Sequence, residues 1–415
     1  MQKWRENMYR RRRRRRRRRM PTLVLILLIA LAVGAFLIFF YAGGKSSYRK
    51  GMKAFENGRY EQAESYLEKA ISKKSNSRNY RYAYGMTLLQ NGQYDEAINQ
   101  FERAISEKDT KKALKLNKET YRGMGICYFF AKNYENSIHY FDAALDINEL
   151  YYINVDILKY KAQAETYLGN YESAIEIYSE IIKEDGYSSD MYLKRAYSYV
   201  ENDNVTDAVA DYDYVIGKDE DAFDAYLGAY SVLMKEEEDE KADSYLEAAL
   251  KIEPDTTDEK LKYAVIQYYY YGITEEAVAS LETLVEEGEP EGYFYLAKIS
   301  YAEGDFDQVS SYLNSYVSAE DVEHLAEAYE MLGRSAMLKK DYTEALKWFE
   351  TGIACNDIKW TQTLKKDQIA VYEYLSDFAK AYEAAKEYLA DFPDDQDIKR
   401  ELEFIKTRLS KNEME

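Results

Sequence analysis

The sequence predicts an all-α protein, a solenoid of about ten helix–turn–helix repeats that follows a single transmembrane helix. Three observations support this fold class. An uncharged apolar run follows ten consecutive arginines near the amino terminus. A motif of about fifteen residues returns roughly every 35 residues through the rest of the chain. Within each copy, apolar residues recur at helical spacing.

The apolar run at residues 21–42 has the length and composition of a transmembrane helix. From Thr22 to Ala42 it carries no charged residue, and about 20 apolar residues at 1.5 Å rise span the roughly 30 Å hydrocarbon layer. A cleaved signal peptide is the alternative, because small residues stand at 42–44. Secretory apolar cores usually run only about 7 to 15 residues, so an uncleaved anchor is favoured.

Charge on the two flanks of this run predicts its orientation. Twelve basic residues (Lys3, Arg5 and Arg10 to Arg19) precede it, and four follow it within 15 residues. The positive-inside rule therefore places the arginine-rich tail, residues 1–20, in the cytoplasm and the large remainder outside it. Beyond this topological role, Arg10 to Arg19 are able to bind anionic lipid, or to act as a ligand for nucleic acid or protein.

The rest of the chain is strongly acidic. Because residues 1–20 carry a net charge of +11 and the whole chain −19, the remainder carries −30. Such a charge repels phosphates, so we expect no nucleic-acid partner for this region. Two cysteines, Cys127 and Cys355, are too few for a disulfide framework. We place Cys127 in the core and Cys355 at the edge of a loop.

Internal repeats determine the predicted fold. The segment NGRYEQAESYLEKAI (57–71) aligns without a gap with NGQYDEAINQFERAI (91–105), and eight further copies follow. An equivalent position recurs at steps of 32 to 40 residues and is small in nearly every copy: Ala63, Ala97, Ser137, Ala174, Ala208, Ala242, Ala277, Val309, Ala345 and Ala381. Ten copies in phase indicate a repeat protein whose stacked units bury one continuous core.

Each copy is predicted to be a pair of helices. In the first copy Tyr48, Met52 and Phe55 form one apolar stripe, and a second stripe begins at Tyr60. Gly58 separates the stripes, which predicts a tight turn between two helices. A single pair cannot bury both stripes, so the pairs must stack on one another.

These features resemble the tetratricopeptide repeat family over roughly residues 45 to 393. The second copy is among the closest to the family pattern, at Gly85, Gly92, Tyr94, Ala97, Phe101 and Ala104. The sixth copy departs most, since KEEEDE stands where the family has Gly and Tyr. The resemblance implies a right-handed α-α superhelix over residues 43–393. Residues 394–415 read as a final polar-faced helix that caps its exposed end.

The resemblance also implies that the first helix of each pair lines the inner face of the superhelix. Projecting the repeat register onto this face gives a candidate peptide-binding groove of apolar residues: Tyr48, Met52, Phe55, Tyr82, Met86, Leu89, Ile126 and Phe129. Later first helices are more polar at these places, with Lys159, Gln163, Thr166, Lys262, Lys298, Glu330 and Arg334. An apolar groove bearing Met and Tyr suits an amphipathic helix or an extended peptide. The alternative is that these side chains only pack against their neighbours.

The sequence carries no catalytic constellation, phosphate-binding loop or metal-ligand spacing, so we expect no enzymatic activity, cofactor or metal. The stretch KDTKKALKLNK (108–118) is the one basic segment of the acidic region. Two interpretations of it stay open. It docks on anionic lipid or an acidic partner, or it is a solvated extension of a helix.

The sequence therefore predicts a non-enzymatic protein–protein interaction scaffold. We expect a single-pass protein of the cell membrane, with its repeats on the extracytoplasmic side, in a cell that low cysteine use and simple layout suggest is bacterial. One alternative is an accessory subunit of an envelope enzyme or of a secretion or assembly complex. Another is a cytoplasm-facing adaptor, if the orientation is inverted.

Overall fold

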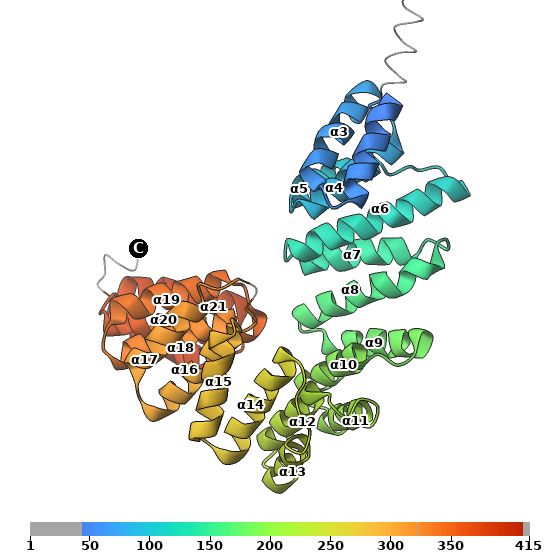
Figure 1. The fold of residues 1–415 in the computed structure, drawn as a ribbon. Coiled ribbons are helices and arrows are strands. Elements are labelled where there is room, and N and C mark those ends of the chain that lie inside the picture. The colour runs from blue at the N-terminus through green and yellow to red at the C-terminus, as the bar shows by residue number, and fades with distance from the viewer. Residues whose placement is uncertain (1–43, 321, 410–415) are drawn as a thin grey trace, which may run out of the picture. The chain divides into compact units, whose positions relative to one another are not determined.

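The computed structural model describes residues 44–320 and 322–409, which form helices joined by turns and loops and contain no strand (Figure 1). The predicted arginine-rich tail, the predicted membrane helix at 21–42 and residues 410–415 of the predicted cap lie outside these ranges. None of the helices within the ranges is long and apolar enough to cross a bilayer. The all-α repeat fold is confirmed for the described part of the chain.

The helices follow one another in pairs that match the predicted register. Residues 44–56 are helical and pair with α3 (Tyr60–Lys73). The later pairs are α4 (Arg78–Gln90) with α5 (Tyr94–Glu102), α6 (Lys111–Phe130) with α7 (Tyr134–Leu145), α8 (Asn154–Tyr167) with α9 (Tyr171–Asp185), α10 (Ser189–Glu201) with α11 (Val205–Ile216), α12 (Phe223–Lys235) with α13 (Asp239–Ala249), α14 (Thr257–Tyr271) with α15 (Glu275–Glu286), α16 (Glu291–Glu303) with α17 (Phe306–Tyr316), α18 (Leu325–Leu338) with α19 (Tyr342–Ala354), and α20 (Ile358–Tyr374) with α21 (Phe378–Asp391). A short 3-10 helix (Tyr151–Ile153) precedes α8, and α22 (Gln396–Lys406) follows the last pair.

The chain divides into two compact units, which we call unit 1, up to Ala164, and unit 2, from Glu165. Inside unit 1, α4 packs against α6 as well as against α5. Inside unit 2, α10 packs against α12, α12 against α14, and α18 against α20. The first helices of successive pairs therefore contact each other directly, which places them on the inner side of each stack.

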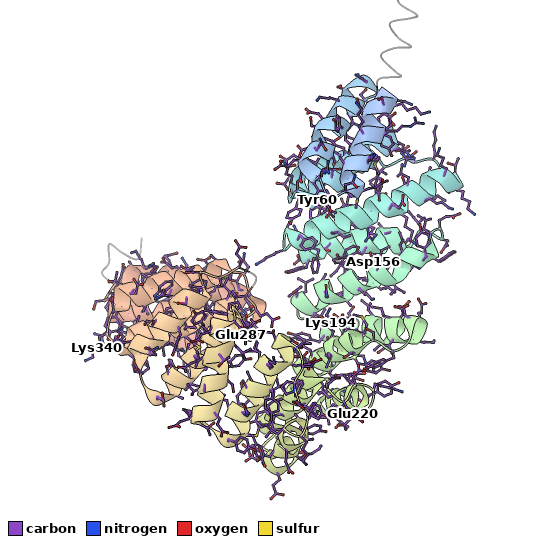
Figure 2. The ribbon with its side chains drawn as sticks, in the orientation of Figure 1. Tyr60, Asp156, Lys194, Glu220, Glu287 and Lys340 are labelled. Carbon is purple, nitrogen blue, oxygen red and sulfur yellow. The ribbon has the colours of Figure 1, made fainter. Side chains whose placement is uncertain are left out.

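The turn inside each pair puts one residue in the left-handed region of the backbone. These residues, all with positive φ, are Gly58, Gly92, Lys132, Gly169, Asp203, Glu237, Gly272, Gly304, Lys340 (labelled in Figure 2) and Ser376. Glycine is favoured there because it has no Cβ to clash with the next carbonyl. The sixth pair, whose KEEEDE lacks the expected glycine, still makes the turn, with Glu237 at φ 60°.

Small residues let the two helices of a pair approach closely. Ala97 at the recurring small position is fully buried. A Cβ added to Gly125 on α6 would lie 2.5 Å from Cδ1 of Phe141 on α7, and one added to Gly333 on α18 would lie 2.3 Å from Cε1 of Phe349 on α19. Each aromatic ring thus fills the space that a side chain on the facing helix would need, and this contact fixes the distance between the two helices.

The terminal helix α22 is attached to the last pair by its first turn. Asp395 accepts hydrogen bonds from two backbone N–H groups of that turn, and its Oδ2 lies 2.7 Å from Lys366 Nζ and 2.6 Å from the Tyr388 hydroxyl. The hydrogen bond from Lys366, followed by that from Tyr388, holds the pKa of Asp395 well below its usual range. Ile398 is buried at the same junction, so α22 covers part of the end of unit 2.

Candidate functional site

The inner side of unit 1 carries the aromatic residues that the sequence predicts for a groove. Tyr48, from the first helix, stacks on Tyr80 of α4 with ring centroids 4.5 Å apart. Burial, and then the neighbouring Tyr80, raise the pKa of Tyr48, so its hydroxyl stays protonated and able to donate at neutral pH. Met52 lies one helical turn further along the same face and is half-buried.

Tyr82 on α4 occupies the centre of this face. Its ring packs on Phe101 with centroids 6.0 Å apart, yet the side chain remains half-buried rather than enclosed. Burial, and then the charge of Glu119, raise its pKa well above the usual range. Tyr152, 78% exposed in the 3-10 helix before α8, lies close enough to add to this shift. Met86 follows Tyr82 by one turn on α4 and is also half-buried.

One charged pair borders this face. Arg122 on α6 donates a hydrogen bond to the Asp156 carboxylate on α8, and Asp156 is labelled in Figure 2. Burial alone would lower the pKa of Arg122, but the hydrogen bond and the charge of Asp156 raise it above its usual value. The guanidinium is therefore permanently charged and held beside the rings of Tyr82 and Tyr160, which also act on it.

The structure corrects two members of the predicted groove. Leu89 is 6% exposed and Ile126 5% exposed, and both belong to the core of unit 1. The cause is the direct contact between α4 and α6, which covers side chains that point from one first helix to the next. Phe55 packs edge-on against Tyr60, and Phe129 packs edge-on against Tyr160, so both are half-buried within their own clusters.

We call the remaining surface the aromatic face, and define it by Tyr48, Met52, Tyr82, Met86 and Tyr152. Helical spacing in the sequence predicts Tyr48, Met52, Tyr82 and Met86. It missed Tyr152, because a residue in a short turn between helices has no place in the helical period. It also missed the pairing of Arg122 with Asp156, which joins two helices and depends on how α6 and α8 pack.

Some of the equivalent positions of unit 2 are charged, and their side chains form ion pairs within the chain. Lys262 Nζ on α14 lies 2.7 Å from Asp224 Oδ2 on α12 and 2.6 Å from Asp258 Oδ2 on its own helix. Lys298 Nζ on α16 lies 3.3 Å from Glu327 Oε1 on α18. These pairs connect the first helices of neighbouring repeats along the inner side of unit 2.

The last of these clusters contains a buried carboxylate. Glu330 on α18 is 6% exposed and pairs with Arg334, whose Nε also lies 3.1 Å from Asp367 Oδ2 on α20. Burial raises the pKa of Glu330 to about 7, although Arg334 opposes the shift. This cluster, together with Lys262 and Lys298 and their partners, is called the charged face below.

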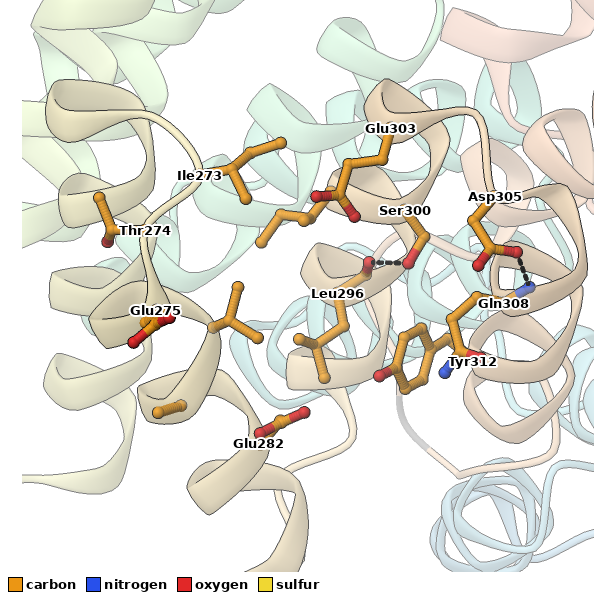
Figure 3. A pocket seen from close by; sticks show the side chains of 13 residues that line it. Ile273, Thr274, Glu275, Glu282, Leu296, Ser300, Glu303, Asp305, Gln308 and Tyr312 are labelled. Carbon is orange, nitrogen blue, oxygen red and sulfur yellow. Dashed lines mark hydrogen bonds between the residues drawn. The ribbon is translucent and has the colours of Figure 1, made fainter.

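Unit 2 also has a cavity of about 620 Å³ between α15, α16 and α17 (Figure 3). Leu296 and Ile299 are among its apolar lining residues. Glu282 and Glu303 lie on opposite sides of the space. None of its lining residues is basic. The cavity is open to solvent, and its polar lining groups are carboxylates, hydroxyls and one amide.

The described ranges also contain two cysteines. Cys127 is fully buried, as predicted, and burial raises the pKa of its thiol to about 12. Cys355 is half-buried at the end of α19, and neither thiol forms a disulfide. Among the described residues, no group of three or more His, Cys, Asp or Glu side chains is placed to hold a metal ion.

Tetratricopeptide repeat family models match residues 48–112, 123–189 and 326–354. None of the curated proteins compared with the chain matches it significantly.

Several solved structures are similar at low sequence identity. The C-terminal part of a tetratricopeptide repeat-containing protein from Cytophaga hutchinsonii is 17% identical, over 69% of this chain and 99% of that one, with a TM-score of 0.44. A tetratricopeptide repeat protein from Parabacteroides merdae is 16% identical, over 60% and 94%, with a TM-score of 0.44. YrrB, described as having an unusual peptide-binding site, is 18% identical, over 46% and 95%, with a TM-score of 0.38.

The family matches fall on the same helix pairs in which small residues and aromatic rings interlock, in both units. Residues 48–112, 123–189 and 326–354 therefore match tetratricopeptide repeats.

Proposed function

We propose that the protein is a membrane-anchored, non-enzymatic scaffold that binds a segment of a partner protein on the aromatic face of unit 1. The observation that carries this proposal is the contrast between the two inner faces. Tyr152 is exposed and Tyr82 and Met86 are only half-buried in unit 1, whereas the charged groups on the charged face of unit 2 are matched by partners within the chain.

The chemistry of the aromatic face suits a peptide. Tyrosine offers a large apolar ring together with a hydroxyl that donates to a peptide carbonyl, at low cost in side-chain entropy. Methionine adapts its shape to irregular apolar surfaces. A partner segment with apolar side chains and an available backbone, whether helical or extended, meets both requirements.

Anchorage and orientation are supported by the sequence. Residues 21–42 are long and apolar enough to span a bilayer, and twelve basic residues before them against four after them favour a cytoplasmic amino terminus. The repeats are then on the extracytoplasmic side, where they would organise proteins of the cell envelope.

External protease applied to intact cells, with any wall removed, tests the orientation. We expect the repeats to be digested while an amino-terminal fragment survives in the membrane. Full protection of residues 45–415 would contradict an extracytoplasmic position and favour the cytoplasm-facing adaptor. Replacing eight of the arginines by serine should give a mixed orientation, because the charge asymmetry is then largely removed.

Photo-cross-linking tests the binding surface. A photoreactive phenylalanine analogue replaces Tyr152 on the aromatic face or, as a matched control, Tyr271 in unit 2, which is 60% exposed. Both sites are accessible, so differences in yield report the location of the partner. We expect protein adducts from position 152 in intact membranes. Adducts from position 271 alone would move the binding surface to unit 2.

A further inference from the structure

The cavity between α15, α16 and α17 is lined by residues from two successive turns of unit 2 (Figure 3). Ile273 and Thr274 precede α15, while Glu303 ends α16 and Asp305 caps α17. None of the residues that line the cavity belongs to the charged face. The cavity is therefore a second surface of unit 2, separate from the ion pairs that connect the first helices.

Two stacked aromatic rings occupy the corresponding place elsewhere in the chain. Tyr94 begins α5, three residues before the recurring small position, and its ring stacks on Phe130 at the end of the next first helix, with centroids 6.1 Å apart. Tyr342 at the start of α19 stacks in the same way on Tyr374 at the end of α20, with centroids 4.8 Å apart. In both places the rings fill the space between a turn and the following helix.

The seventh pair has no such rings. Counted from the recurring small position of each pair, Thr274 and Ala302 stand at the two places that the rings hold elsewhere. Thr274 still caps α15, because its hydroxyl accepts a hydrogen bond from the backbone N–H of Ala277 at 3.2 Å. The turn is thus kept while both side chains that would fill the space are small, which explains why a cavity opens here.

Carboxylates without a cationic partner surround this cavity. Glu275, Glu282 and Glu303 line it and are exposed, and none of them forms an ion pair with a described residue. Residues 273–312 contain ten acidic residues and one basic residue, Lys298, which belongs to the charged face. Glu303 also ends α16, where the helix dipole disfavours an anion. A cation held between these carboxylates would offset their mutual repulsion.

The lining favours an organic cation with apolar surface over a metal ion. In the described part of the chain, no three carboxylates are placed to hold a metal ion. Ile273 is 43% exposed, and Val278 and Tyr312 add further apolar surface. A guanidinium group forms paired hydrogen bonds with a carboxylate and stacks on an aromatic ring. The volume of about 620 Å³ lies within the roughly 300–1,000 Å³ of ligand pockets.

We propose that this cavity binds a basic segment of a partner protein in which arginine adjoins an apolar side chain. We call it the acidic groove and define it by Thr274, Glu275, Glu282, Glu303 and Tyr312. The carboxylates would bind the guanidinium groups, and the apolar lining would cover the neighbouring side chain. The proposal does not depend on the aromatic face or on the membrane anchor, so the scaffold would have two binding surfaces of different chemistry.

Binding of labelled peptides to the full-length chain in a nonionic detergent tests the groove. The probe is a short peptide that alternates arginine with leucine, and its controls alternate arginine with serine or glutamine with leucine. We expect fluorescence anisotropy to show about ten-fold tighter binding of the arginine–leucine peptide than of either control, because only this peptide meets both the charge and the apolar lining. Equal affinity for the arginine–serine peptide would overturn the proposal, since charge alone would then suffice.

Removal of the groove carboxylates locates the binding. Glu282→Gln/Glu303→Gln should weaken the arginine–leucine peptide about ten-fold, with a melting temperature at or above that of the native protein because like charges are removed. The matched control Glu286→Gln/Glu287→Gln removes the same charge from exposed positions of α15 and its end that do not line the cavity, and it should bind nearly as the native protein does. Equal losses in the two variants would contradict a localised groove.

Filling the cavity without a change of charge gives an independent result. Thr274→Tyr/Ala302→Phe places in the seventh pair the two rings that stack elsewhere in the chain, and it should abolish binding of the arginine–leucine peptide. Ser311→Tyr, at an exposed position of α17 outside the lining, is the control. Native affinity in the filled variant, with a melting temperature near that of the native protein, would overturn the proposal.

The arginine-rich tail of the same chain is the competing occupant. Replacing Arg10 to Arg19 by serine in the full-length chain should leave the affinity for the arginine–leucine peptide unchanged. An increase of about ten-fold would mean that the tail competes for the groove, which would overturn the assignment to a partner protein. Failure of the aromatic face is scored separately, because capture through position 152 does not use this peptide.

Discussion

Unit 1 and unit 2 differ at the same two positions of one first helix each, α4 in unit 1 and α18 in unit 2. Tyr82 and Met86 on α4 stand where Glu330 and Arg334 stand on α18, at the same distances from the recurring alanine of their pairs. In unit 1 these positions hold a ring and a thioether that are half-buried and pack against the core. In unit 2 they hold charges that are matched across neighbouring helices. The same repeat positions therefore accommodate either half-buried apolar side chains or paired charges.

Ion pairs and half-exposed apolar side chains contribute differently to folding stability and to binding. Partly exposed ion pairs such as Lys262 with Asp224 contribute only about 0.2–1 kcal/mol each to stability, so the charged face serves chiefly to fix which helices neighbour one another. Apolar surface that remains half-exposed adds little to folding but becomes favourable when a partner covers it. We therefore expect changes in the charged face to alter stability and changes in the aromatic face to alter binding.

The largest expected effect comes from overpacking a helix pair of unit 2. The Cβ of valine in Gly333→Val would overlap the Phe349 ring, and we expect a loss of about 3 kcal/mol from unit 2. Because repeats interact mainly with their neighbours, unit 1 should stay folded and keep capturing its partner. Urea unfolding and capture are measured together, with the exposed Ala302→Val as control. Loss of capture would show that the two units are not independent.

The stability of unit 2 should depend on pH through Glu330 of the charged face, and the aromatic face has no such carboxylate. The folded pKa of Glu330 is about 7, above the ordinary 4.5, so the folded state binds a proton more tightly than the unfolded one. Proton binding by Glu330 therefore contributes fully to the stability of the folded state below pH 4.5. This contribution, at most about 3 kcal/mol, is lost as the pH rises through 7.

The variant Glu330→Gln cannot titrate at this site. Between pH 4.5 and pH 8 it should lose less stability than the native protein in urea unfolding. The exposed Glu247→Gln on α13 is the matched control and should follow the native protein. If the two variants behave alike, the burial of Glu330 does not govern the pH response of unit 2.

Substitutions at the turn residues with positive φ should change the stability by smaller amounts, with a sign that follows from the backbone conformation. Glu237 and Ser376 adopt φ of 60° and 58°, where a Cβ is unfavourable, so Glu237→Gly and Ser376→Gly should each stabilise unit 2 by about 0.5–1 kcal/mol. The reverse change Gly92→Ala, at φ 74° in unit 1, should cost a similar amount. Equilibrium unfolding measures all three, and a destabilising Glu237→Gly would mean that its side chain makes a contact that outweighs the backbone strain.

Much of this fold could be predicted from sequence because the repeat multiplies weak signals. The small residue at Ala63 and its equivalents, the turn at Gly58 and the buried Cys127 all follow from the period and from helical spacing. The repeat also continues where a local residue is unfavourable for the turn, as at Glu237, because stacking against neighbouring pairs fixes the turn.

The binding surface was less predictable for a physical reason. Helical spacing places Leu89 and Tyr82 on one stripe, but which of them is covered depends on how closely α4 approaches α6. Tyr152 lies in a turn without a period, and the pairing of Arg122 with Asp156 joins separate helices. Each of these features depends on tertiary packing, which a single sequence does not specify.

The central claim is that the aromatic face of unit 1 binds the partner, and one paired measurement tests it most directly. Met86→Glu and the control Lys298→Glu are compared for melting temperature and for capture of the partner cross-linked through position 152. Met86 is half-buried, so its replacement can turn a carboxylate to solvent. We expect a melting temperature near that of the native protein with capture reduced at least ten-fold, and near-native capture by Lys298→Glu. A clear fall in the melting temperature of Met86→Glu with capture intact would contradict the claim, because the residue would then serve only the core.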